Sequence, residues 1–195
     1  TIEFDGVYKN SEVWLNGHFL GKRPFGYISF SYELNKYLKR GKNIIAVKVD
    51  NDAQPNSRWY TGSGIYRNVW LVYANPVHIA QWGVYAYPEV QKGNGILNVE
   101  VEVENGSAAK STLTVLNELI SKDGKSVAKA SSKVDVAAKQ NGKISVKLNV
   151  KNPQLWDLEN PNLYELKTTV LQDGKDIDKT VTKTGFRNFT FDPNN

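Results

Sequence analysis

Strict alternation of apolar and polar residues is the feature that most constrains this chain. It is clearest in residues 99–104, Val-Glu-Val-Glu-Val-Glu, where every second residue is valine. Successive side chains of a β-strand point to opposite faces, so the pattern predicts an antiparallel strand with one face in a core and the other in water. We interpret the three glutamates as a solvated face rather than a cation site.

Similar segments follow one another after Pro76, separated by turn dipeptides such as Asp123-Gly124 and Asp173-Gly174. Two further turns are expected at Asn105-Gly106 and Asn141-Gly142. The predicted strands are residues 77–87, 95–104, 111–120, 126–136, 143–150, 163–172 and 175–186. Seven strands of similar length within about 110 residues are typical of an immunoglobulin-like sandwich.

The part before Pro76 also alternates with period two. Residues 13–15 run into Asn16-Gly17, a strong hairpin signal, and Phe19-Leu20 resumes a strand after it. Further strands are predicted at residues 27–34 and 43–49, with at most one helical turn between them. The sequence therefore predicts an all-β fold in two units.

Composition excludes several classes of function. The 195 residues contain no Cys and only two His, so disulfides, zinc fingers, iron–sulfur clusters and thiol nucleophiles are ruled out. The net charge is +5, but the lysines after Pro76 alternate with acidic residues instead of clustering with stacking aromatics, which argues against nucleic-acid binding. No apolar run approaches the roughly 20 residues of a membrane-spanning helix.

Candidate catalytic groups are few. Asp50 and Asp52 lie in a polar stretch that we interpret as a turn. The weaker alternative is a cluster of oxygen ligands of the kind that binds calcium. His18 and His78 read as structural. Gly62-Ser63-Gly64 lacks the spacing of a nucleophile elbow or a phosphate loop. The residues themselves therefore predict no catalytic residue, no metal ligand and no cofactor in this stretch.

The segment from Ser57 to Leu71 is the richest in recognition chemistry. It combines Arg58, Trp59 and Tyr60 with a glycine-rich turn and a second aromatic group ending at Trp70. Aromatic faces stack on the C–H surfaces of sugars and a guanidinium donates to hydroxyls, so the segment fits a sugar-binding rim. The alternative, equally open on composition alone, is that its rings fill a core and Arg67 pairs with an acid.

Five ordered blocks of the first unit resemble glycoside hydrolase family 2, most closely its β-galactosidase branch. The blocks are residues 4–7 (Phe-Asp-Gly-Val), 13–17 (Val-Trp-Leu-Asn-Gly), 26–30 (Gly-Tyr-Ile-Ser-Phe), 38–47 and 57–71. In the second unit, residues 152–164, with Trp156 and Pro161-Asn162-Leu163-Tyr164, resemble the immunoglobulin-like domain of that family. Gly185-Phe186-Arg187 resembles the segment that leads into the family's catalytic (β/α)₈ barrel.

The resemblance implies a domain division. Residues 1–75 would be the later part of a sugar-binding jelly roll, and residues 76–187 an immunoglobulin-like sandwich. Residues 188–195 would begin the linker to a barrel outside this chain. The start without Met, in what reads as the middle of a strand, fits a piece of a longer protein whose jelly roll begins earlier.

The resemblance also implies a function for the whole protein. It would hydrolyse terminal β-linked galactose by a retaining mechanism with two carboxylates, both in the barrel. This chain would then be a non-catalytic scaffold that is inactive alone, with the barrel and a carbohydrate substrate as its partners, and many family members form homo-oligomers. Some relatives place a sugar-binding acid just before the Gly64-Ile65-Tyr66-Arg67 block, where this chain has Arg58, Trp59 and Tyr60 as rim candidates.

Two alternatives remain open at the level of sequence. One is a stand-alone carbohydrate-binding or adhesion module, whose basic and aromatic first unit binds glycans. The other keeps the family but changes the sugar, which makes the chain the accessory portion of a β-glucuronidase or a β-mannosidase.

Overall fold

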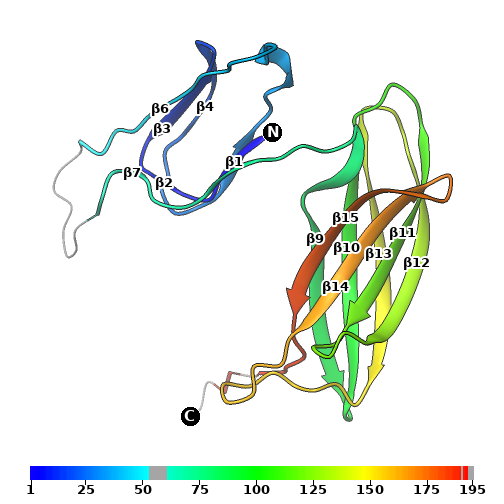
Figure 1. Ribbon diagram of the computed structural model, residues 1–195. Helices are drawn as coiled ribbons and strands as arrows, with labels where there is room; N and C mark the ends of the chain where they lie inside the picture. The colour runs from blue at the N-terminus through cyan, green and yellow to red at the C-terminus, as the bar shows by residue number, and fades with distance from the viewer. Residues whose placement is uncertain (53–60, 190, 193–195) are drawn as a thin grey trace. The chain divides into compact units, whose positions relative to one another are not determined.

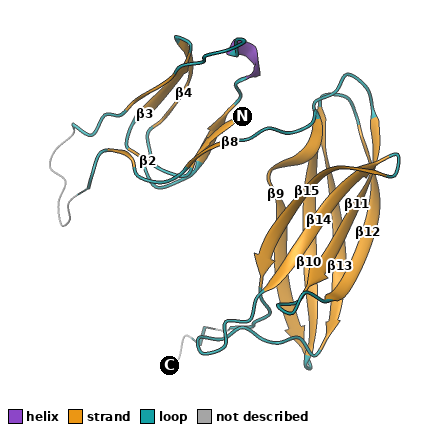
Figure 2. Cartoon of the chain, in the orientation of Figure 1, coloured by secondary structure: helices purple, strands orange, loops and turns teal. Residues whose placement is uncertain are grey.

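The computed structural model describes residues 1–52, 61–189 and 191–192 and shows an all-β chain, as the sequence predicts. It divides into two compact units, Thr1–Tyr73 and Ala74–Asn195 (Figure 1). In the described residues, helical structure is confined to one 3₁₀ turn, η1 (Asn35–Tyr37), drawn in purple in Figure 2. The single helical turn expected between two strands of the first unit is thus confirmed.

The first unit consists of short antiparallel strands in three small sheets, with the orders β5-β1-β8, β4-β3-β6 and β2-β7. The strands are β1 (Ile2–Phe4), β2 (Val7–Tyr8), β3 (Ser11–Leu15), β4 (His18–Arg23), β5 (Phe30–Tyr32), β6 (Ile45–Lys48), β7 (Gly64–Ile65) and β8 (Val69–Leu71).

The predicted hairpin joins β3 to β4. Asn16 and Gly17 both have positive φ, 51° and 84°, as the two-residue turn requires. The Asn16 side chain also organises its surroundings, because Nδ2 donates to the backbone oxygen of Tyr37 at 2.9 Å and Oδ1 accepts from the amide of Ile44 at 3.0 Å. This one residue therefore fixes the hairpin and the segment that leads into β6.

The core of the first unit is open along one side. In β1 and β3, Phe4 and Leu15 are buried, and their neighbours across the sheets are Val69 of β8 and Ile45 of β6. Residues directly opposite each other point to the same face, so Val69 and Ile45 also face the core. They are nevertheless 42% and 40% exposed.

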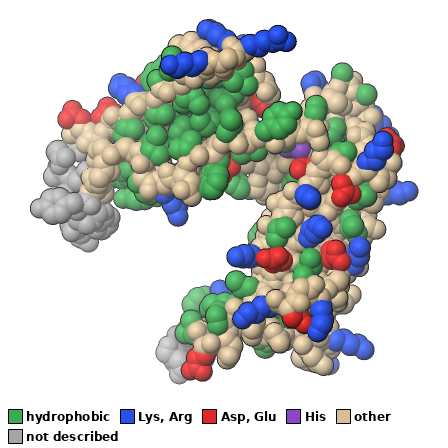
Figure 3. Space-filling model, in the orientation of Figure 1, with side chains coloured by type: hydrophobic (Ala, Val, Ile, Leu, Met, Phe, Trp, Pro, Cys, Tyr) green, Lys and Arg blue, Asp and Glu red, His purple; other side chains and the backbone are tan. Residues whose placement is uncertain are grey.

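We call the core-facing residues of these two edge strands the open edge: Ile45 and Val47 of β6 with Val69 and Leu71 of β8. Figure 3 shows a broad apolar surface over the first unit.

The second unit is a sandwich of two sheets with the orders β13-β10-β9 and β12-β11-β14-β15. Its strands are β9 (Val77–Gln91), β10 (Asn94–Asn105), β11 (Ser111–Ile120), β12 (Ser126–Val136), β13 (Gln140–Lys151), β14 (Tyr164–Gln172) and β15 (Lys175–Thr184). All pairings are antiparallel. The seven strands of the predicted immunoglobulin-like sandwich are therefore present, each within a few residues of its expected bounds.

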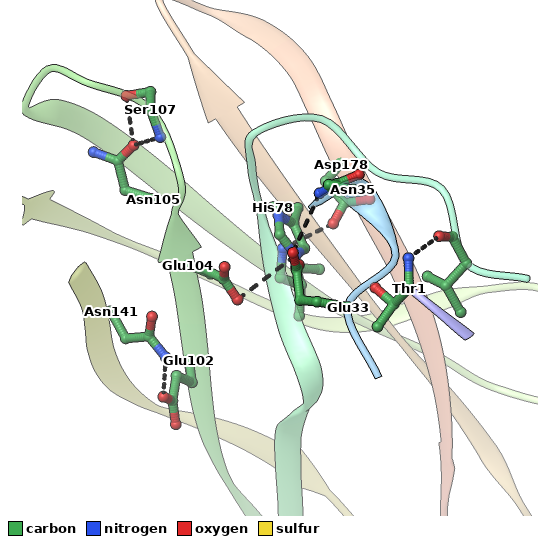
Figure 4. A network of polar contacts seen from close by, with 12 residues as sticks. Thr1, Glu33, Asn35, His78, Glu102, Glu104, Asn105, Ser107, Asn141 and Asp178 are labelled. Carbon is green, nitrogen blue, oxygen red and sulfur yellow. Dashed lines mark hydrogen bonds and ion pairs between the residues drawn. The ribbon is translucent and has the colours of Figure 1, made fainter. Parts of the chain in front are cut away.

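The alternating segment of β10 behaves as predicted. Val99, Val101 and Val103 are buried in the sandwich, and the glutamates between them point outward. Glu102 accepts a hydrogen bond from Asn141 at 2.7 Å, and Glu104 lies 3.9 Å from His78 Nε2 (Figure 4). At the end of the strand, Asn105 is fully buried and its Oδ1 accepts from the amide and hydroxyl of Ser107.

Two local predictions are wrong. The strand expected at residues 27–34 is only β5, and Ile28 is exposed instead of facing the core. Asn141-Gly142 is not a turn, because both residues pair with β10 inside β13, and the chain reverses earlier, near Lys139. A glycine is required at position 142 because the side chain of Val136 packs against it. A Cβ at this position would lie 2.6 Å from a methyl group of Val136.

Candidate carbohydrate-binding rim

The three rim residues predicted from sequence, Arg58, Trp59 and Tyr60, lie outside the described residues. The residues on both sides of this segment are described, and they place its two ends close together. Asp50 donates its amide to the backbone oxygen of Lys9 at 3.1 Å, and Gly64 pairs with Tyr8 in the β2–β7 ladder. Both ends of the segment therefore emerge beside β2.

Side chains fasten the two ends as well. Asn51 Nδ2 donates to Ser63 Oγ at 2.9 Å, across the base of the segment. Asp50 Oδ1 accepts from the amide of Asp52 at 3.1 Å, an Asx-type contact that agrees with the turn predicted here. Asn10 Nδ2 donates to the backbone oxygen of Asp50 at 3.0 Å. The base of the segment is thus held by hydrogen bonds on both sides.

Four aromatic side chains gather beside this base, and we call them the aromatic rim: Tyr8, Phe25, Tyr27 and Tyr66. Tyr27 lies at the centre, with ring-centroid distances of 5.2 Å to Tyr8, 5.7 Å to Phe25 and 6.4 Å to Tyr66. The planes are tilted or edge-to-face, the arrangements that aromatic pairs favour. Because Tyr27 and Tyr66 are about half exposed, the cluster presents ring surface to solvent.

Two glycines let these rings lie against the backbone. A Cβ on Gly26 would lie 2.4 Å from Cδ2 of Tyr8, and one on Gly6 would lie 2.6 Å from the ring of Tyr66. Tyr66 Oη also donates to the backbone oxygen of Gly26 at 2.8 Å. Any side chain at either glycine would therefore displace a ring of the aromatic rim.

For the segment from Ser57 to Leu71, the alternative was that its rings fill a core. This alternative does not fit its described rings, Tyr66 and Trp70. Tyr66 is 48% exposed and Trp70 is 52% exposed, and the indole of Trp70 donates to Asp5 at 3.0 Å on the surface. Arg67 is exposed and has no acidic partner within the described part of the chain.

The carboxylates with displaced pKa values lie elsewhere, on the surface of the second unit. A hydrogen bond from Lys125 lowers the pKa of Asp123 to about 2, with a further hydrogen bond from Ser121. A hydrogen bond from Lys110 lowers the pKa of Asp135. A general acid needs a raised pKa, so these groups are unsuited to that role at neutral pH.

Asp123 borders a hollow of about 750 Å³ in the second unit, together with Lys122, Lys151, Gln154 and Tyr164. Its carboxylate is engaged there by Lys125 at 2.7 Å. The hollow therefore combines lysines with one neutralised acid and lacks the facing carboxylates of a retaining glycosidase.

The two histidines have structural surroundings. His18 stacks on Tyr37 with a centroid distance of 4.3 Å and an interplanar angle of 9°, and His78 lies in β9 beside Glu104. Within residues 1–52, 61–189 and 191–192, no group of three or more His, Asp or Glu side chains could hold a metal ion. None of the helices in the same ranges could span a membrane.

Comparison with known proteins matches both parts of the chain to one family. Residues 1–76 match the sugar-binding domain of glycosyl hydrolases family 2, and residues 77–187 match the family description "Glycosyl hydrolases family 2". The chain belongs to glycosyl hydrolase family 2. The resemblance predicted from sequence is therefore confirmed, and the chain corresponds to the non-catalytic N-terminal domains of family enzymes.

Two curated relatives show similar degrees of identity. β-Galactosidase BoGH2A of Bacteroides ovatus is 46% identical over 193 residues, which cover 98% of this chain and 23% of that protein. A putative β-glucuronidase of Formosa agariphila is 46% identical over 187 residues, 95% of this chain and 17% of that protein. This chain therefore spans about a fifth of the length of the curated relatives that it matches.

A solved family member has the same fold. The crystal structure of a glycosyl hydrolase family 2 member from Bacteroides cellulosilyticus superposes with a TM-score of 0.91 at 33% identity. The match covers 97% of this chain and 26% of that one. The predicted jelly-roll and immunoglobulin-like fold class is confirmed.

Sequence reasoning missed three members of the aromatic rim, Tyr8, Phe25 and Tyr27. Tyr27 was assigned to a strand by its alternation with Ile28 and Phe30. The available signal was Pro24-Phe25-Gly26-Tyr27: proline and glycine at alternate positions favour irregular backbone, and aromatics in irregular backbone are candidates for ligand contact.

Proposed function

We propose that this chain is the accessory portion of a β-galactosidase-like glycosidase, which hydrolyses terminal β-linked galactose with carboxylates that lie outside the chain. The observation that carries the proposal is the match of the family's domains to nearly the whole chain, with 46% identity to a β-galactosidase. The chain alone is expected to be inactive.

We propose the division of labour that the resemblance implies. Residues 1–75 are the later part of the sugar-binding jelly roll, and residues 76–187 are the immunoglobulin-like link. Residues 188–195 begin the connection to the catalytic barrel. The open edge supports the first assignment, because core-facing residues such as Leu71, 75% exposed, call for further protein to cover them.

In this proposal the aromatic rim supports the segment that carries Arg58, Trp59 and Tyr60 at the border of the active site. The support for it is the hydrogen-bonded base at Asn51 and Ser63, beside the exposed rings of Tyr27 and Tyr66. Aromatic rings and the exposed guanidinium of Arg67 suit the C–H faces and hydroxyls of a sugar. The role of these residues is recognition, because aromatic and guanidinium side chains cannot replace the two carboxylates of a retaining glycosidase.

A second candidate is the accessory portion of a β-glucuronidase. It is favoured by the equal identity, 46%, to a putative β-glucuronidase of Formosa agariphila. The two candidates share the fold and the catalytic chemistry and differ in the sugar ring that the whole protein accepts.

The test uses the whole polypeptide that carries this chain, and the chain alone, on nitrophenyl β-galactoside, β-glucuronide and β-mannoside. We expect the whole protein to hydrolyse the galactoside fastest and the chain alone to match a blank. Preference for the glucuronide would select the second candidate. Turnover by the chain alone would contradict the accessory role.

A further inference from the structure

The outer face of the sheet β13-β10-β9 carries a pair of exposed tyrosines that the proposed function leaves unused. Tyr85 and Tyr87 are two residues apart on β9, so both point to the same side, and their ring centroids lie 5.2 Å apart at an interplanar angle of 33°. Tyr85 is 62% exposed. Val84, just before Tyr85, and Ala86, between the two tyrosines, pack against the core, so the tyrosines face outward.

The register of the sheet places polar groups beside the two rings. Glu100 of β10 is directly opposite Tyr85, and Asn98 is directly opposite Tyr87. One strand further on, Lys147 of β13 is opposite Asn98. Opposite residues share a face, so rings, carboxylate, amide and ammonium form one surface. We call Tyr85, Tyr87, Asn98 and Glu100 the tyrosine platform.

Part of this surface is held in place by hydrogen bonds. Asn98 is only 5% exposed, and its Nδ2 donates to Glu89 Oε1 at 2.9 Å. The other carboxylate oxygen of Glu89 accepts from Gln91 at 3.2 Å. Two amides thus orient the Glu89 carboxylate next to Tyr87. Glu100, in contrast, is exposed and makes no hydrogen bond or ion pair with any residue in the described ranges.

The chemistry of the platform selects its ligand. The centres of protein interfaces are depleted of charged residues, whereas here the charged side chain of Glu100 lies directly opposite Tyr85. Rings that stack on C–H faces, beside carboxylates that accept from hydroxyls, suit a carbohydrate. On this face Glu89, Glu100 and Glu102 are balanced by Lys143, Lys147 and Lys151, so no net charge attracts an anionic glycan. The matching ligand is a neutral oligosaccharide.

We propose that the tyrosine platform is a second carbohydrate-binding site, outside the active site, that holds a neutral β-linked glycan by stacking on Tyr85 and Tyr87 and by hydrogen bonds to Glu100, while the buried Asn98 holds Glu89 in place beside them. The inference rests on the proposed function for its substrate class. It adds a site in the second unit that keeps the protein on a polymer while the active site works on chain ends.

The experiment is affinity electrophoresis of the whole polypeptide in gels that contain soluble β-1,4-galactan, with polygalacturonan as the acidic counterpart. We expect galactan, and not polygalacturonan, to retard the protein. The double variant Tyr85→Ala/Tyr87→Ala should bind galactan at least tenfold more weakly, whereas Tyr85→Phe/Tyr87→Phe should stay within about twofold of the parent. Tyr73→Ala, which removes a tyrosine that is 97% exposed, is the matched control and should change nothing.

Hydrolysis of nitrophenyl β-galactoside by the same preparations separates the two proposals. Absence of hydrolysis by the parent would reject the proposed function and not the platform. With hydrolysis intact, the platform is rejected by an unretarded parent, by unchanged retardation of the double alanine variant, or by stronger retardation in polygalacturonan. Thermal unfolding of each variant identifies any that is misfolded. If the double alanine variant is misfolded, the single variant Tyr85→Ala replaces it, and unchanged retardation of that variant rejects the platform.

Discussion

The two units use the same antiparallel strands but differ in how completely they enclose a core. In the described residues, the core cluster of the second unit has 17 buried apolar residues between two sheets, and that of the first has seven. In the second unit, core-facing residues of central strands, such as Val115 and Leu166, are fully buried. In the first, the core-facing residues Ile45 of β6 and Val69 and Leu71 of β8 remain exposed. The second unit is closed by its own strands, whereas in our proposal the first is completed by protein outside the chain.

Matched leucines in the two cores give the largest expected effect. Leu15 of β3 and Leu119 of β11 are both fully buried near the end of a strand. Leu119→Ala should destabilise the second unit by about 4 kcal/mol, because neighbours on both sides hold the cavity open. Leu15→Ala should cost about 2 kcal/mol, since the open edge lets the site collapse. Urea unfolding measures both, and equal losses would contradict the comparison.

Charging the open edge is the next test. Ile45→Lys should change the stability of the chain alone by no more than about 0.5 kcal/mol, because the side chain is already partly in water. In the whole polypeptide the same change should cost about 3 kcal/mol, because a charge is then buried without a partner. The control is Val127→Lys on β12, a partly exposed residue of the closed unit, which should behave alike in both contexts. An equally small effect of Ile45→Lys in both would mean that nothing covers the edge.

Glycines distinguish filled from empty space. Gly142→Ala should cost about 2 kcal/mol, because the new methyl group would overlap the side chains of Val134 and Val136. Gly62→Ala in the first unit meets no atom of the described residues within 4 Å and has no positive φ, so its effect should stay below about 0.5 kcal/mol. Thermal unfolding compares the loss of stability in the two variants. A larger loss for Gly62→Ala than for Gly142→Ala would contradict the comparison of the two units.

The smallest effect concerns Asp123. Its folded-state pKa of about 2 lies below the ordinary 3.8, so its favourable interaction is present above pH 3.8 and is lost as the pH falls through about 2. Lys125→Met removes the largest cause and should move the pKa back toward 3.8. Titration followed by carboxyl ¹³C chemical shifts measures it. An unchanged pKa would assign the shift to Ser121 instead.

Much of the second unit could be predicted from sequence because its physics is local. Period two in residues 99–104 and the dipeptides Asp123-Gly124 and Asp173-Gly174 determine strands and turns without distant partners. The turn predicted at Asn141-Gly142 was wrong because the dipeptide has the composition of a turn. Its glycine is instead required by the close contact with Val136, 6 residues away in sequence and on another strand. Such a contact leaves no local pattern.

The site was harder to predict for the same reason. The composition of the segment from Ser57 to Leu71 was enough to predict it as a candidate site. The aromatic rim, in contrast, joins residues 8, 25, 27 and 66. These positions are distant in sequence and meet only through the β2–β7 pairing and the close approach of Gly6 and Gly26. The tyrosine platform likewise depends on the register of three strands. Sequence supplies the members of such sites, and topology assembles them.

Hydrogen exchange tests the central claim most directly, by comparing the 195-residue chain with the same residues in the whole polypeptide. We expect the amides of β6 and β8 to exchange at least tenfold more slowly in the whole polypeptide, while those of β10 and β11 are protected alike in both. Equal protection of β6 and β8 in the two contexts would contradict the claim that the first unit is completed by other parts of a glycosidase.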